Sequence, residues 1–114
     1  ALASDAPATA WADADNPFYS IKAAVLRRAH NGADIGQHQA VTLGQALELY
    51  THRAAACTTA TGVGSIAAGA DADFVVLDRD LFAVPADEID QVRVRETWIR
   101  GRRVWPTAGR PEAG

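Results

Sequence analysis

The aspartate close to the start of the chain is the first candidate for chemistry. In the opening sequence ALASDAP, the apolar residues 1–3 are followed by Ser4, Asp5 and Pro7. An apolar run that breaks into a polar, proline-containing loop is typical of the end of a strand. On these residues alone, a single aspartate before a loop is more often a turn former or a cap than a catalytic group.

The other side chains that can bind a metal or act as nucleophiles are few and widely spaced. The chain has three histidines, His30, His38 and His52, and one cysteine, Cys57, and it contains no H-x-H. A zinc hydrolase site needs three or more ligands, and two residues five apart share a helix face poorly. We therefore expect two surface-loop histidines, one helix histidine, and a small buried cysteine without an internal disulfide.

A third group of residues is basic and aromatic. The segment VRVRETWIRGRRVW (92–105) holds five arginines and two tryptophans. Proteins that bind single-stranded nucleic acid use such interleaving, but arginine alternating with valine is also the ordinary outer face of a half-buried strand. Because the net charge is −3, we expect no nucleic-acid partner. No apolar run approaches the roughly 20 residues of a membrane span, so we expect no membrane partner either.

The first half of the chain predicts two helices. Asn16 is a good N-cap before Pro17, and the apolar spacing that follows predicts a helix over 17–29. Residues 30–40, with two glycines and no period, predict a loop.

The second predicted helix has the clearer start. Thr42 and Gln45 have the spacing of a capping box, and an apolar stripe then predicts a helix over 43–57. The sequence TGVG at 61–64 follows it and favours a helix end.

The second half of the chain has the pattern of strands. The apolar run Phe74–Leu77 predicts a strand that is covered on both faces. Residues 92–105 predict a hairpin that turns at residues 100–102, with a bulge or partial cover on both faces near Glu96. We also expect a short strand at residues 65–66, a turn or short helix at 85–92, and a frayed tail at 107–114.

Four segments in this order resemble the C-terminal end of the amidohydrolase superfamily, in particular its amidohydrolase-3 branch, which includes N-substituted-formamide deformylase-like enzymes. The resemblance covers roughly residues 3–105, and its most specific element is G-S-I-x-x-G-x-x-A-D-F-V-V-L-D at 64–78. The four segments are SDAP (4–7), TLGQALELYTHRAA (42–55), GSIAAGADADFVVLDRD (64–80) and VRETWIRGRRVW (94–105).

The resemblance implies a larger α/β parent protein, of which this chain would be the last quarter. Such a parent has a (β/α)8 barrel and a small β-sandwich built from strands before and after the barrel. Residues 1–60 would then hold the tip of barrel strand 8 and the closing helices. Residues 61–106 would form the C-terminal part of the β-sandwich, and residues 107–114 a disordered tail. The chain itself would be locally α+β.

The resemblance also implies a reaction and a site. Asp5 would ligate a divalent metal, expected to be zinc, and would take a proton from the attacking water, whose pKa such an ion lowers toward roughly 7. The parent would hydrolyse a non-peptide C–N bond in a small amide or formamide-like substrate. The single cysteine, rather than the resemblance, leads us to expect a cytoplasmic location. Trp11 would either line the substrate pocket or act as a packing anchor. Alone, the chain is expected to be inactive and to bind no cofactor.

A non-catalytic module is the alternative interpretation. A small α+β domain that self-associates or binds a partner would need no chemistry from Asp5. Under both interpretations, the helix faces that would cover a barrel are expected to be exposed and apolar, and such patches drive association. We therefore expect a homo-oligomer, or association with the missing barrel portion.

Overall fold

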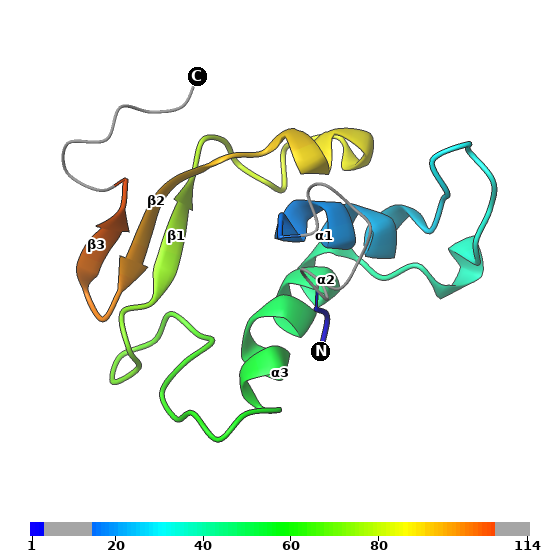
Figure 1. Cartoon of the computed structure of the whole chain (residues 1–114). Coiled ribbons are helices and arrows are strands. Elements are labelled where there is room, and N and C mark those ends of the chain that lie inside the picture. Colours follow the sequence, from blue (N-terminus) through cyan, green and yellow to red (C-terminus); the bar gives the residue numbers. More distant parts are fainter. Residues whose placement is uncertain (4–14, 107–114) are drawn as a thin grey trace.

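Helices occupy the first half of the fold and strands the second. The computed structural model describes residues 1–3 and 15–106. The helical elements are α1 (Pro17–Leu26), the 3-10 helix η1 (Gln37–Gln39), α2 (Leu43–Tyr50) and α3 (His52–Ala55). They are followed by β1 (Phe74–Leu77), the 3-10 helix η2 (Ala86–Gln91), β2 (Val94–Ile99) and β3 (Arg102–Trp105), as Figure 1 shows.

The first helix starts where the sequence predicts and ends earlier. The Asn16 side chain accepts a hydrogen bond from the Phe18 N–H at 3.0 Å, which confirms the predicted cap. The helix ends at Leu26 rather than at residue 29, because Arg27 adopts a left-handed conformation with φ of 47°. The Arg27 guanidinium then donates to the Ile35 carbonyl at 2.9 Å, which fixes the start of the following loop.

The loop at 30–40 is irregular, as predicted, but it is held by its own side chains. The Asp34 carboxylate accepts the N–H groups of Gln37 and Gly36, each at 2.7 Å, just before the short helix η1. These two bonds lower the pKa of Asp34 below its ordinary value of 3.8.

The second predicted helix is interrupted. The capping box is confirmed, because Thr42 Oγ1 accepts the Gln45 N–H at 3.2 Å and Gln45 Oε1 accepts the Thr42 N–H at 2.9 Å. The prediction of one helix over 43–57 is wrong, since Thr51 leaves helical geometry with φ of −115° and ψ of −95°. The Thr51 hydroxyl donates to the Leu47 carbonyl at 2.8 Å, a local bond that competes with the helix.

The segment after α3 packs closely against it without forming a strand. Gly64 has φ of +84°, and a Cβ atom there would lie 2.7 Å from the Ala55 Cβ. The predicted strand at residues 65–66 is absent, and Ile66 is 87% exposed.

The three strands form one antiparallel sheet in the order β1-β2-β3. The predicted hairpin turns at Arg100 and Gly101, which both have positive φ, the geometry of a type I′ turn. The predicted bulge is confirmed one residue from Glu96: Val76 pairs with Glu96 but Leu77 pairs with Val94.

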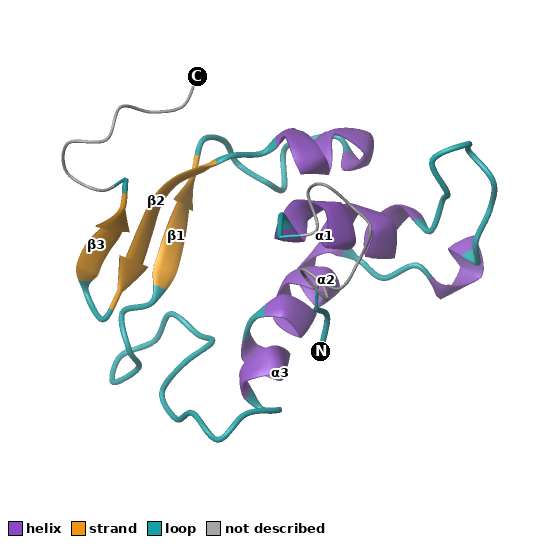
Figure 2. Ribbon diagram, in the orientation of Figure 1, coloured by secondary structure: helices purple, strands orange, loops and turns teal. Residues whose placement is uncertain are grey.

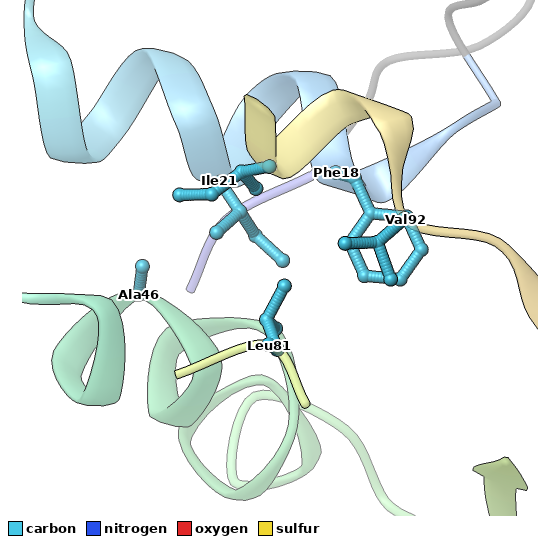
Figure 3. Close-up of a cluster of buried hydrophobic side chains, with 6 residues drawn as sticks. Phe18, Ile21, Ala46, Leu81 and Val92 are labelled. Carbon is cyan, nitrogen blue, oxygen red and sulfur yellow. The ribbon is translucent and has the colours of Figure 1, made fainter. Parts of the chain in front are cut away.

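The core joins the two halves of the chain. It is formed by α1, α2 and the segment that connects β1 to β2 (Figure 3). A Lys22–Asp90 ion pair of 3.0 Å, between largely covered side chains, also links α1 to η2. The core thus includes residues on both sides of the predicted domain boundary after residue 60. That boundary stays a prediction about the parent protein. The six buried side chains are Phe18, Ile21, Ala46, Leu81, Ile89 and Val92.

The sheet lies beside the helices rather than under them (Figure 2). Strand β1 was predicted to be covered on both faces, but Val75 is 50% and Val76 41% exposed. The prediction is wrong for this chain, because α1 packs on α2 and η2, and no described helix lies over the sheet.

Candidate functional site

The predicted site residue, Asp5, lies outside the described residues, as does Trp11. The structure describes the residues that precede Asp5 in the sequence. The Leu2 N–H donates to the Leu49 carbonyl at 3.0 Å, and the Leu2 side chain packs against the core. The start of the chain is therefore fixed to the last turn of α2.

The sequence of α2 explains why an acceptor is available there. The last carbonyls of a helix have no partner within the helix. Because α2 ends at Tyr50, the Leu49 carbonyl is one of them, and the Thr51 N–H and hydroxyl both bond to Leu47 instead. The break at Thr51 thus leaves the Leu49 carbonyl available to accept the hydrogen bond from the Leu2 N–H.

A shallow, open depression lies beside this contact. It contains one imidazole, His52, and an ion pair between Glu48 and Arg53 at 3.1 Å, whose side chains are largely exposed. These groups do not make a complete hydrolytic site. The lining residues are Ala1, Glu48, Leu49, His52, Arg53 and Ala56.

The described residues do not fit a metal ion. Within residues 1–3 and 15–106, no three His, Cys, Asp or Glu side chains gather closely enough to hold one. His30, His38 and His52 are exposed and belong to separate parts of the chain. Ligands for the divalent ion that the resemblance implies would have to include groups outside the described residues.

Cys57 was predicted to be buried, and this prediction is wrong. The residue is exposed, because α3 ends at Ala55 and Cys57 follows in the turn beyond it. Its Sγ lies 3.5 Å from the Arg53 carbonyl.

A polar cluster that the sequence did not indicate joins the ends of β1 and β2. Asp78 accepts the Arg79 guanidinium at 2.8 Å and the Arg93 N–H at 3.0 Å, and its own N–H donates to the Arg93 carbonyl. The bond to Arg79 and then the bond to Arg93 lower the pKa of Asp78 to about 2. Because both carboxylate oxygens have partners, the cluster is structural. No sequence spacing rule connects residues fifteen apart across a loop.

Several hairpin arginines contact acidic side chains or a backbone carbonyl. Arg103 contacts Glu96 at 3.4 Å, Arg100 lies 4.0 Å from Asp71, and Arg93 donates to the Asp90 carbonyl.

In the part of the chain that the structure describes, no helix has the length and apolar character needed to span a bilayer.

Comparison with known proteins identifies the family. The amidohydrolase family matches residues 1–105, and the chain belongs to this family. The chain is 32% identical over 94 residues to the putative amidohydrolase YtcJ of Bacillus subtilis (strain 168), which covers 79% of the chain. It is 35% identical over 101 residues to the N-substituted formamide deformylase of Arthrobacter pascens, which covers 88% of the chain.

The chain spans 18% of the length of each of these two relatives. No solved structure matches the chain. Family membership therefore supports a hydrolase, while the activity of a whole protein stays a matter of proposal.

Proposed function

We propose that the chain is the C-terminal part of a hydrolase that cleaves a non-peptide C–N bond in a small amide or formamide-like substrate. The observation that carries this proposal is the family match over residues 1–105, in a chain that spans 18% of each relative. The name of one relative, N-substituted formamide deformylase, supports formamides as the first substrates to test. The isolated chain would be inactive, because the described residues supply no complete site.

The proposed parent has a (β/α)8 barrel, with residues 2–5 at the tip of its eighth strand. The Leu2–Leu49 hydrogen bond joins the apolar start of the chain to the last turn of α2, so the start of the chain and the proposed closing helices pack as one unit, as this placement requires. Residues at the C-terminal tips of barrel strands are where such enzymes place their reactive groups. The strands β1 to β3 would belong to the accompanying β-sandwich.

In this proposal Asp5 has two roles, both carried by the resemblance to the family. It would be a ligand of a divalent metal, proposed to be zinc, and it would move a proton from the attacking water to the leaving nitrogen. The metal would supply activation of that water. The described residues hold no ligand cluster for the ion, so no step is assigned to them.

Replacement of Asp5 in the intact parent tests these roles. We expect Asp5→Asn to abolish turnover of an N-substituted formamide or other amide substrate. The side-chain carboxamide of the introduced asparagine is a poor proton acceptor, whereas the carboxylate of Asp5 can take a proton. The thermal unfolding midpoint should stay close to that of the wild-type protein. Asp15→Asn is the matched control, since Asp15 is an exposed aspartate just before α1. Retention of a tenth of the activity by Asp5→Asn would exclude Asp5 as the proton-transferring group.

A non-catalytic module that self-associates or binds a partner is the second candidate. The observation in its favour is the buried core, to which α1, α2 and the β1–β2 connection all contribute.

For the parent hydrolase we further propose a cytoplasmic location and no nucleic-acid or membrane partner. The single cysteine, which is a free thiol, fits a reducing compartment.

A further inference from the structure

Asn31 lies in the exposed turn between α1 and η1, directly before Gly32. The side-chain carbonyl oxygen of Asn31, Oδ1, accepts the N–H of Ala33 at 3.1 Å. Such a bond to the backbone two residues on is a common feature of asparagine in turns. It holds the side-chain amide against the following backbone, where the next nitrogen along the chain belongs to Gly32.

The hydrogen bond at Oδ1 also affects the reactivity of the side-chain amide. A nucleophile that attacks Cγ of Asn31 pushes an electron pair onto Oδ1, and a donor at that oxygen stabilises the developing charge. The Ala33 N–H is such a donor. The nitrogen of Gly32 can act as the nucleophile, because its attack on Cγ closes the small, unstrained ring of a succinimide.

Gly32 leaves this attack unhindered. It is exposed, has φ of +85°, and a Cβ atom there would meet no atom within 4 Å beyond its chain neighbours. One hydrogen bond opposes the attack, from the Gly32 N–H to the Ala29 carbonyl at 2.9 Å. Because the turn is exposed, water can replace this bond at small net cost in free energy.

Asn16 provides a comparison within the same chain. It is the second of the two asparagines, and its Oδ1 likewise accepts the N–H two residues on, from Phe18 at 3.0 Å. The residue that follows it is Pro17, whose nitrogen has no proton to lose and so cannot form the ring product. Asn16 thus has the same side-chain hydrogen bond as Asn31 without the nucleophile.

We propose that Asn31 is a deamidation site, at which the native turn allows the Gly32 nitrogen to displace the side-chain amide. The bond from this nitrogen to Cγ forms, the Cγ–Nδ2 bond breaks, and the proton of the Gly32 N–H leaves as part of ammonia. Water then opens the succinimide at either carbonyl, which leaves aspartate or isoaspartate at residue 31. The proposal does not depend on the reaction of the parent enzyme.

The isoaspartate product would change the turn. The Ala29 N–H donates to the Ala33 carbonyl at 2.8 Å, and the Ile35 N–H donates to the Arg27 carbonyl at 3.0 Å. Isoaspartate adds one carbon to the main chain between the members of both pairs, so their register would have to change. Aspartate keeps the main-chain length, and both products add a negative charge to the connection between α1 and α2.

Peptide mass tests the proposal on the intact protein, purified from the cells that produce it. The protein is incubated at neutral and at mildly alkaline pH and is then digested with trypsin in mild acid, where deamidation is slow. Cleavage after Arg28 and Arg53 isolates Asn31, and cleavage after Lys22 places Asn16 in another peptide. A synthetic peptide of residues 29–37 is the unfolded reference.

Asn31→Gln is the matched control variant. Glutamine keeps the side-chain amide, but attack by the Gly32 nitrogen would then close a larger ring, which forms more slowly. The variant also reports any mass gain at the glutamines of the same tryptic peptide.

We expect the peptide with Asn31 to gain the mass of an amide-to-acid conversion, faster at higher pH because attack needs the deprotonated Gly32 nitrogen. At least a tenth of Asn31 should convert in the time in which half of the synthetic peptide converts. The products should be a mixture of aspartate and isoaspartate, which chromatography separates. Conversion at Asn16 and in the Asn31→Gln variant should be at least tenfold slower.

Three results would overturn the proposal. Conversion of less than a tenth in the intact protein would show that the native turn protects Asn31. Equal conversion at Asn16 would show that the Gly32 nitrogen is not needed. Aspartate as the sole product would indicate direct hydrolysis of the side chain by water, without the ring.

Discussion

Asp78 shows how one residue can fix the ends of two strands. Its backbone and carboxylate both bond to Arg93, so the chain leaves β1 and returns to β2 at a fixed distance. Between these two residues lie Leu81 and Ile89, which belong to the core. The cluster around Asp78 therefore positions a segment on which the packing of α1 depends.

The lowered pKa of Asp78 predicts a loss of stability in acid. The pKa is about 2 in the folded chain against 3.8 for the ordinary carboxyl, so the ionised form is favoured by folding. The contribution of the ionised Asp78 carboxylate to the free energy of unfolding is fully present above about pH 4, and it is lost as the pH falls toward 2. Unfolding by denaturant between pH 2 and 6 should show a weaker pH dependence for Asp78→Asn. The exposed Asp87 supplies the control, Asp87→Asn. Parallel pH profiles for the wild type and Asp78→Asn would contradict this role.

At the scale of elements, Gly64 secures the contact between α3 and the segment that follows it. Gly64 and Gly69 both have positive φ, but only at Gly64 would a Cβ meet other atoms. The strain of φ alone is about 1–2 kcal/mol for a residue with a Cβ. Gly64→Ala should therefore lower the free energy of unfolding by more than Gly69→Ala, which carries the φ strain without the contact. Equal decreases in the free energy of unfolding, measured with denaturant, would contradict this expectation. They would show that the atoms around Gly64 move to accommodate a Cβ at no energetic cost.

Elements whose signals are local could be predicted from the sequence. Asn16 and the Thr42–Gln45 pair determine helix starts within three residues, and the turn at Arg100–Gly101 is set by its own backbone. The helix break at Thr51 depends on the backbone dihedral angles of that residue and on the hydrogen bond from its hydroxyl to the Leu47 carbonyl. A threonine in a continuous helix could make the same hydrogen bond, so the residue type alone does not predict a break. Sequence periodicity cannot distinguish such a helix from a continuous one.

Long-range features escaped prediction for a different reason. The exposed position of Cys57 follows from the helix ending early, and the exposed β1 follows from the placement of the helices beside the sheet. The placement of the helices depends on contacts between distant segments, which periodicity does not report. For the candidate site, Asp5 was proposed from resemblance to a family rather than from spacing. The contact between Leu2, three residues earlier in the sequence, and Leu49 had no sequence signal.

At the scale of the whole molecule, uncovered apolar surface predicts association of the isolated chain. The exposed apolar side chains include Tyr19, Val75, Phe82 and Ile99, each of which is 45% exposed or more. We expect the purified 114-residue chain to form oligomers or aggregates at tens of micromolar, because burying such surface is favourable. Light scattering checks this directly. A single monomeric species at that concentration would contradict the expectation.

We propose above that residues 1–114 are the C-terminal part of a larger amidohydrolase. The most direct test is the intact mass of the protein, captured with an antibody against this chain from the cells that produce it and analysed by mass spectrometry. We expect a mass several times the 12.1 kDa of this chain. A mass close to 12.1 kDa would contradict it, since the cell would then make this segment alone and the family ancestry would explain its fold but not its function.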